Sequence, residues 1–293
     1  MEESKADKIT VGNVEIIAVL DMVPPPRAPE LMFPDVAPED WAPYQDTLEH
    51  GKLQLYYGVW VERSQGQTIL VDTGMGPGPH PERGNRTGNL YEELRPILIP
   101  ADRSANTNVS PSDEVDTVVH THLHGDHVGW NVRYSGGMPA PNFRRARYLA
   151  PKLDWEHFAK PEVLAAHPHI KTQVMPLQRL RKMDLIEGEH SVTDEVTTLP
   201  TPGHTPGHQA VLISSQGERA MIVGDILHTK AQVHEPAWTA RVDVDKEMSR
   251  RSREALLDRA ENEGYVVAAG HFHPKENIGK VVRLEGKRYW QIL

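Results

Sequence analysis

Short apolar runs alternate along this chain with polar stretches rich in glycine and proline. Residues 9–21 are rich in β-branched side chains and partly alternate with polar ones, which predicts a strand or a hairpin. Further apolar runs predict strands at 53–63, 67–74, 115–119, 195–199, 209–214, 219–225 and 265–270, and a terminal hairpin at 281–292. The pattern therefore predicts two strand-rich regions, one in each half of the chain.

Helical patterns follow each strand-rich region. Asp245 and Gly264 are the expected N-cap and C-cap of the clearest helix, and Pro151 opens another, followed by a helical stretch over 161–182. This order predicts an α+β fold, in which two packed mixed β-sheets carry helices on their outer faces (an αββα sandwich). Without a break in composition, we expect one domain over 1–293, with an N-terminal flap at 22–52 and a helical insertion at about 150–190.

Net charge, cysteine content and the length of the apolar runs exclude several classes of protein. The chain has 293 residues and a formal net charge of −9, so it lacks the basic surface that a dedicated nucleic-acid binder needs. It contains no cysteine, which excludes disulfides, thiol nucleophiles and thiolate metal ligands. No apolar run is long enough to cross a membrane and no secretory signal is visible, so we expect a cytoplasmic protein without membrane contact.

The stretch with the strongest chemical signal is 117-TVVHTHLHGDHVGW-130. In extended chain, side chains two positions apart point the same way, so His122 and His124 can converge on one metal ion. Gly125 then permits a reversal that directs Asp126 and His127 to a second point nearby. The pattern H-x-H-x-D-H fits in this register only, because starting at His120 would place His124 and Gly125 at the positions of the aspartate and the last histidine. His120 is therefore expected beside the metal site.

Three later residues also stand just past predicted strands. His204 lies in 200-PTPGHTPGHQ-209, Asp225 ends 221-MIVGD-225 and His271 ends 266-VVAAGH-271. Functional side chains gather at such positions because the rigid strands hold them in place. These residues are therefore candidates for the same site.

Together these segments resemble the ordered motifs of the metallo-β-lactamase-fold hydrolases: VDTG at 71–74, HTHLHGDH, TPGHTPGH, GD at 224–225 and GH at 270–271. The match spans residues 69–271. Within the superfamily, THLHGDHVGWN and the long stretch before VDTG are most similar to the lactonase and organophosphate-hydrolase branch. The resemblance implies the αββα sandwich already suggested by the order of elements.

The resemblance also implies a dinuclear metal centre. A first ion would be bound by His122, His124 and His204, a second by Asp126, His127 and His271, and Asp225 would bridge the two. Imidazole and carboxylate ligands suit Zn²⁺ best, with Co²⁺, Mn²⁺ or Fe²⁺ possible. Asp72 is expected to accept a hydrogen bond from a ligand histidine and to orient it.

The implied reaction is hydrolysis by a bridging hydroxide that opens a lactone or cleaves an ester of a small molecule. Asp126, Asp225 and His228 are the candidate catalytic residues. Phosphotriesterase and β-lactamase activities would use the same site. A mononuclear iron dioxygenase and a non-catalytic metal-binding protein are alternatives that the complete set of ligands disfavours.

His228 marks a departure from the branch. Lactonases of this fold that open acyl-homoserine lactones often carry tyrosine three residues after the bridging aspartate, where this chain has histidine. Two roles are open for His228: donation of a hydrogen bond to the developing negative charge, or a loop position without function. An apolar pocket wall is a further hypothesis, built from Phe33, Trp41, Trp60 and Trp238. The family also implies a homodimer, with residues 24–50 as a candidate contact.

Overall fold

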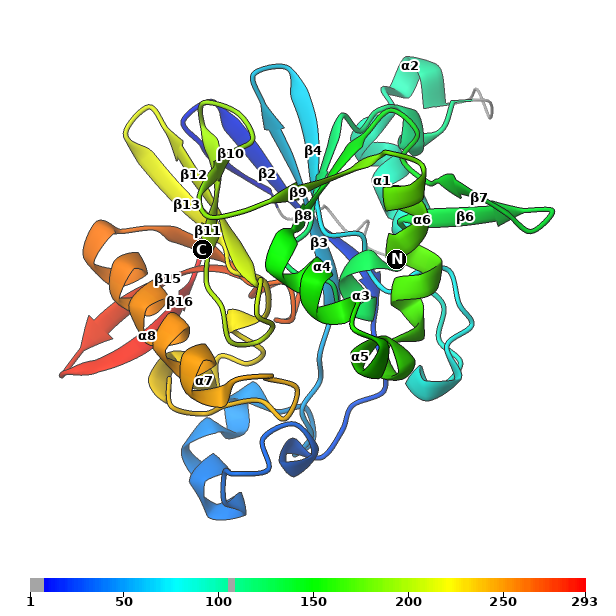
Figure 1. Cartoon of the computed structure of the whole chain (residues 1–293). Helices are drawn as coiled ribbons and strands as arrows, with labels where there is room; N and C mark the ends of the chain where they lie inside the picture. The colour runs from blue at the N-terminus through cyan, green and yellow to red at the C-terminus, as the bar shows by residue number, and fades with distance from the viewer. Residues whose placement is uncertain (1–7, 105–108) are drawn as a thin grey trace.

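The computed structural model describes residues 8–104 and 109–293, and its core is a pair of seven-stranded sheets (Figure 1). The first sheet runs in the order β1 (Lys8–Val11), β2 (Val14–Met22), β3 (Tyr57–Ser64), β4 (Gln67–Val71), β5 (Thr117–Val119), β8 (Arg147–Pro151) and β9 (Met183–Ile186). The second runs in the order β10 (His190–Ser191), β11 (Val196–Pro200), β12 (Gln209–Ser215), β13 (Glu218–Ile222), β14 (Val266–Ala268), β15 (Ile278–Leu284) and β16 (Lys287–Ile292). Both sheets are mixed: the first has parallel pairs at β4–β5, β5–β8 and β8–β9, and the second has one at β13–β14.

Alternation along the strands builds two apolar layers on the first sheet. On β3, Val59 and Val61 pack toward the helices, whereas Trp60 packs between the sheets. On β4, Leu70 takes the helix side, whereas Ile69 takes the side between the sheets. Successive strand residues point to opposite faces, so a strand buried on both faces reads as a continuous apolar run.

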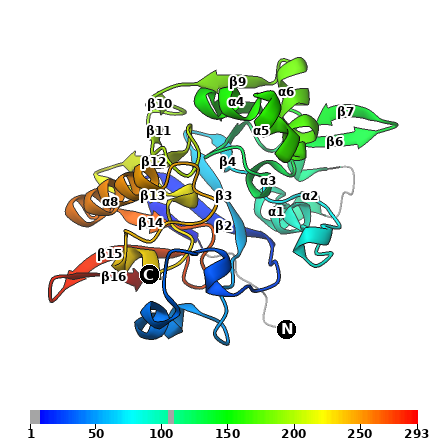
Figure 2. The ribbon, with the colours of Figure 1, turned by 60° about the horizontal axis from the view of Figure 1, so that its bottom comes forward.

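Helices cover the outer face of each sheet. On the first sheet they include α1 (Leu90–Leu98), α4 (Lys152–Phe158) and α6 (Met175–Arg179), with α2 (Ala101–Ser104), α3 (Gly125–Val128) and α5 (Pro161–Ala166) nearby. On the second sheet, α8 (Lys246–Glu263) packs Leu256 and Ala260 against Met221 and Val267, and α7 (Ala231–His234) lies beside it. Figures 1 and 2 show α8 and α1 on opposite sides of the strands. The predicted αββα sandwich is confirmed.

The segment before β3 forms a flap with its own small core. It contains the 3-10 helices η1 (Pro29–Leu31) and η2 (Pro38–Thr47). The rings of Phe33 and Trp41 lie 5.6 Å apart, and those of Trp41 and Trp238 lie 4.7 Å apart. The hypothesis of an aromatic pocket wall is wrong: these three rings fill the core of the flap, and Trp60 is buried between the sheets.

Two helical regions differ from the expectations. The helical stretch expected over 161–182 is interrupted at His167, because Pro168 restricts the residue before it. Helix α5 ends there, and the chain is helical again over 168–179, through the π-turn η5 (Ile170–Val174) and α6. Helix α1 was not among the predicted elements, although Leu90, Leu94 and Leu98 are spaced four apart and are buried. In the part of the chain that the structure describes, no helix is long and apolar enough to cross a membrane.

Candidate metal centre

All seven predicted metal ligands meet at one edge of the sandwich, where strands of both sheets end. The segment after β5 and helix α3 supplies His122, His124, Asp126 and His127. The loop between β11 and β12 supplies His204, the turn η6 (Gly224–Ile226) after β13 supplies Asp225, and the segment after β14 supplies His271. Residues separated by up to 149 positions in the chain thus form two adjacent groups that suit a metal ion.

The first group joins His122, His124, His204 and Asp225. His124 Nδ1 lies 3.0 Å from His122 Nε2 and 2.9 Å from His204 Nε2. Asp225 Oδ2 lies 3.1 Å from His204 Nε2 and 3.7 Å from His122 Nε2. Three ring nitrogens and one carboxylate oxygen therefore converge on one point.

The second group joins Asp126, His127 and His271, and Asp225 faces it with its other oxygen. Asp225 Oδ1 lies 3.1 Å from His127 Nε2 and 3.0 Å from His271 Nε2. Asp126 is more distant, with its oxygens 3.9 Å from His127 Nε2 and 4.0 Å from His271 Nε2. The two oxygens of Asp225 thus face different groups, which is the arrangement a bridging carboxylate requires.

The chemistry of these atoms fits two divalent cations. Asp225 Oδ1 and His127 Nε2 are buried and make no hydrogen bond among the described residues. Buried polar atoms in native proteins are normally hydrogen-bonded or bound to a metal ion. Burial alone would raise the pKa of Asp225, but the surrounding histidines, His271 first, hold that pKa well below its usual range. An ionised carboxylate among imidazole nitrogens is a ligand set typical of zinc.

Comparison with known proteins agrees with this geometry. The family model of the metallo-beta-lactamase superfamily matches residues 57–271, which include every residue of both groups. The chain belongs to the metallo-beta-lactamase superfamily. The family predicted from the sequence is confirmed, and the chain is a metal-dependent hydrolase of this superfamily.

Individual relatives and solved structures resemble this chain over most of its length. The chain is 29% identical over 251 residues to the N-acyl homoserine lactonase AiiA of Bacillus thuringiensis subsp. kurstaki, covering 83% of this chain and 92% of that protein. AidC, a dizinc quorum-quenching lactonase, superposes with a TM-score of 0.81 at 20% identity, covering 98% of this chain and 97% of AidC. The hydrolase AbOPH superposes with a TM-score of 0.81 at 23% identity, covering 100% and 99% of the two chains. The structural matches show the shared fold.

Asp72 orients one side of this metallo-beta-lactamase centre, as its VDTG motif predicted. Its Oδ2 accepts hydrogen bonds from His127 Nδ1 at 2.7 Å and from Thr121 Oγ1 at 2.7 Å. Thr121 Oγ1 in turn lies 3.0 Å from Nδ1 of His122. Burial would raise the pKa of Asp72, but the charges of His127 and His120 bring it down to about 2. The imidazoles of His127 and His122 are thereby held with Nε2 turned toward the centre.

Two further partners of the ligand histidines escaped the sequence analysis. Asp243 is buried and accepts a hydrogen bond from His204 Nδ1 at 2.8 Å, and the carbonyl oxygen of Tyr56 accepts one from His271 Nδ1 at 2.9 Å. Asp243 lies in an irregular loop 39 positions after His204, and Tyr56 acts through its backbone. Neither position carries a sequence signal, because only the folded chain brings them beside their histidines.

Packing around the centre explains the two remaining histidines of the motifs. His120 is buried, lies outside the three candidate metal groups of the described chain, and its Nε2 accepts a hydrogen bond from Asn131 Nδ2 at 3.0 Å. His208 is also buried, and its Nε2 accepts a hydrogen bond from the backbone N–H of Asp225 at 3.0 Å.

The loop that carries His204 packs closely against α8 at Gly203. Gly203 has a φ of 130°, and an added Cβ would lie 2.0 Å from the Ser249 nitrogen, so only glycine lets this loop approach α8.

His228 stands beside the bridging carboxylate. It is buried, and its Nε2 lies 3.3 Å from Asp225 Oδ2. Neither of its ring nitrogens makes a hydrogen bond among the described residues. With Asp225 and His271 it forms a third group of metal-binding geometry. His228 therefore belongs to the centre, either as a group that contacts the substrate or as a further ligand.

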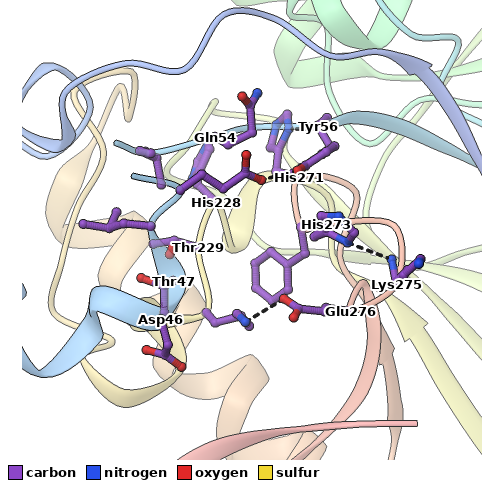
Figure 3. A pocket seen from close by; sticks show the side chains of 15 residues that line it. Asp46, Thr47, Gln54, Tyr56, His228, Thr229, His271, His273, Lys275 and Glu276 are labelled. Atoms are coloured by element: carbon purple, nitrogen blue, oxygen red, sulfur yellow. Dashed lines mark hydrogen bonds and ion pairs between the residues drawn. The ribbon is translucent and has the colours of Figure 1, made fainter. Parts of the chain in front are cut away.

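A large cavity and a smaller pocket border the metallo-beta-lactamase centre. The larger one has a volume of about 760 Å³ and is bounded by His124, Asp126 and Asp225, together with the loop 75–83 and residues 166–173. A smaller pocket of about 240 Å³ touches the centre at His228 and His271. Figure 3 shows these two histidines and Tyr56 at the upper end of this pocket, with Asp46 and Glu276 at the lower end. Residues of both metal groups line the larger cleft, which makes it the better substrate site.

Proposed function

We propose that this chain is a dinuclear metal-dependent hydrolase that opens the ring of a lactone, with esters of small molecules as related substrates. The position of Asp225 carries the proposal, because its two oxygens face two separate groups of imidazole and carboxylate ligands. The relatives that share 29% identity with the chain are N-acyl homoserine lactonases, which supports a lactone as the substrate class.

Within this proposal, His122, His124 and His204 would hold one ion and Asp126, His127 and His271 would hold the other, and Asp225 would be shared by both. We propose zinc, with Co²⁺, Mn²⁺ and Fe²⁺ as alternatives. When bound, the two ions supply a hydroxide nucleophile near neutral pH and polarise the substrate carbonyl. The histidines contribute neutral nitrogen ligands. The Nδ1 atoms of His127, His204 and His271 remain hydrogen-bonded to Asp72, to Asp243 and to the Tyr56 carbonyl oxygen, respectively.

The side chains of the cleft would handle the proton. When the hydroxide oxygen bonds to the lactone carbonyl carbon, Asp126 accepts the proton that this oxygen still carries. The bond between the carbonyl carbon and the ring oxygen then breaks, and Asp126 returns the proton to that oxygen, so that the reaction adds one water. Asp126 lines the cleft and is only partly buried, so a substrate can reach it. His228, whose ring nitrogens make no hydrogen bond among the described residues, would donate a hydrogen bond to the carbonyl oxygen as it gains negative charge.

A pH-stat assay tests this function. Metal-loaded protein is offered an aliphatic lactone, an acyl-homoserine lactone, an aryl ester, a phosphotriester and a penicillin, each of which releases acid on hydrolysis. We expect turnover of at least one lactone well above the other classes. Preference for the phosphotriester or the penicillin would replace the lactone with that substrate class. No hydrolysis of any of the five substrates by protein with two equivalents of metal bound would overturn the proposal. One bound iron together with oxygen consumption would indicate a dioxygenase.

The oligomeric state and the cellular location of the protein are also proposals. We propose a homodimer in which residues 24–50, the flap that projects from the sandwich in Figure 1, form part of the contact. We further propose that the protein acts in the cytoplasm, which its lack of cysteine permits. Light scattering after size-exclusion chromatography tests the dimer, and a monomer mass at micromolar concentration would contradict it.

A further inference from the structure

Two arginines line the same large cleft as the metal ligands His124, Asp126 and Asp225. Arg83 ends the 3-10 helix η3 (Pro81–Arg83), and Arg27 lies at the start of the flap. The backbone of Arg27 is fixed by an antiparallel bridge to Leu53, with N···O distances of 3.0 and 2.8 Å. The two segments are adjacent, since a Cβ added to Gly84 would lie 2.8 Å from Pro25. Both arginines thus sit on anchored backbone at the same wall of the cleft.

Tyr57 connects these arginines to the metal centre. Arg83 Nε donates a hydrogen bond to the Tyr57 hydroxyl at 2.8 Å, and the ring of Tyr57 packs edge-on against the ring of His271 at 5.7 Å. Burial raises the pKa of the Tyr57 hydroxyl to about 12, the charge of Asp126 adds to the rise, and the positive charges of Arg83 and Arg27 oppose it. Arg27, Arg83 and Asp126 therefore all lie within electrostatic reach of one phenol oxygen.

Among the described residues, no carboxylate forms an ion pair with the guanidinium group of Arg27 or Arg83. Elsewhere in the described chain, arginines such as Arg147 and Arg283 pair with Asp184 and Glu261. Among the described residues, Arg27 makes no side-chain hydrogen bond or ion pair, and Arg83 donates only to Tyr57 and, at 3.4 Å, to the carbonyl oxygen of Glu82. Arg83 Nη2 therefore keeps its donors free. A planar guanidinium with free donors is suited to binding a carboxylate.

We propose that Arg83 and Arg27 bind an anionic substituent of the substrate, so that the preferred substrate is a lactone or ester that carries a carboxylate away from the bond that is cleaved. The inference rests on the proposed hydrolase function and adds the charge of the substrate to it. Once Asp126 and Asp225 are neutralised by two divalent ions, the two arginines leave the cleft with an excess of positive charge. Glu82 also lines the cleft, but its single carboxylate leaves one of the two arginine charges uncompensated.

The test compares two substrates that differ only in charge: a γ-butyrolactone with a carboxylate on the ring carbon next to the ring oxygen, and the corresponding carboxamide. We expect the metal-loaded enzyme to favour the carboxylate by at least about tenfold in kcat/KM, as a charge-assisted hydrogen bond would provide. Arg83→Gln and Arg27→Gln should each remove most of this preference by raising KM for the carboxylate alone. Arg83→Lys should restore part of it, and Arg86→Gln, an exposed arginine of the same loop outside the cleft, should change nothing.

Binding provides a second measurement that does not depend on turnover. Calorimetric titration with glutarate and with butyrate should show tighter binding of the dicarboxylate, and Arg83→Gln should abolish the difference. Equal kcat/KM for the two lactones would overturn the charged-substrate inference and leave the lactonase proposal standing. No turnover of either lactone, with arginine-dependent glutarate binding retained, would overturn the lactonase proposal and keep the anion site. The metal content and melting temperature of each variant show whether Arg83 only holds Tyr57 and Asp126 in position. In that case kcat/KM would fall equally for both lactones.

Discussion

Asp225 is the residue on which the centre depends, because its two oxygens face different groups of ligands. We predict that Asp225→Asn lowers kcat/KM by at least about 100-fold, since losing only an outer partner of a ligand typically costs 10–100-fold. The asparagine keeps the size of the side chain but removes the negative charge that offsets two cations. Lactone hydrolysis by metal-replete protein measures the loss, and Asp194→Asn, an exposed residue outside the site, is the matched control. Full activity of Asp225→Asn with two metals bound would contradict the two-metal mechanism.

Asp243 and Asp72 provide a second prediction at this scale, because each orients a histidine of a different metal group. Asp243→Asn should weaken metal binding about 10–100-fold at the group of His204, and Asp72→Asn should do so at the group of His127. Stepwise release of two zinc ions to a chromogenic chelator measures both affinities, and each variant serves as the control for the other. Release curves identical to those of the unmodified protein would show that these carboxylates do not support the ligands.

Among the secondary-structure elements, β3 combines an apolar pattern with one buried acid. Glu62 alternates with Val61 and so faces the same side of the sheet as Trp60, between the two sheets. Its carboxyl oxygens are buried and make no hydrogen bond among the described residues. Burial raises the pKa of Glu62 from 4.5 to about 8, so the folded protein keeps this side chain protonated at neutral pH.

The pKa of Glu62 predicts how stability depends on pH. The folded state holds this proton up to a pH of about 8, whereas the unfolded chain releases it near 4.5, so stability is lost as the pH rises through this window. Glu62→Gln removes this titrating group. We therefore expect the free energy of unfolding of the variant, relative to that of the unmodified protein, to increase from pH 5 to pH 8. Urea denaturation at four pH values measures the difference. A difference independent of pH would contradict the raised pKa.

For the whole molecule, the metal centre joins the ends of strands from both sheets. Ions that bind only the folded state stabilise it by mass action, so removing them should lower the melting temperature by about 10 °C. Differential scanning fluorimetry with and without a chelator measures the shift, and added zinc should reverse it. The Asp225→Asn variant, which binds metal less tightly, should show a smaller shift. An unchanged melting temperature would mean that the ions contribute nothing to folding.

We further propose that the chain unfolds as one unit, because the two sheets share the apolar layer between them. Calorimetry of the metal-loaded protein should then show a single heat-absorption peak. The flap at 22–52 and the insertion at about 150–190 should melt with the sandwich, since the flap packs Phe33 and Trp41 against Trp238, which lies in the second half of the chain. Two separated peaks would contradict a single domain.

The sequence alone was sufficient for the sandwich and for the family. Period-two and continuous apolar runs depend on local geometry, and so do the helix caps at Asp245 and Gly264, which the structure reproduces. The seven proposed ligands were also readable, because the spacing of His122, His124, Asp126 and His127 and the strand ends before the other three are local features.

Tertiary structure decided everything that depends on distant segments meeting. It placed Asp243 beside His204 and the Tyr56 carbonyl oxygen beside His271, and it put the aromatic residues into cores instead of a pocket. It also brought Arg27 and Arg83 to one wall of the cleft, although 56 positions separate them in the chain. None of these contacts leaves a local pattern, because each arises only when the two sheets and the flap are packed together.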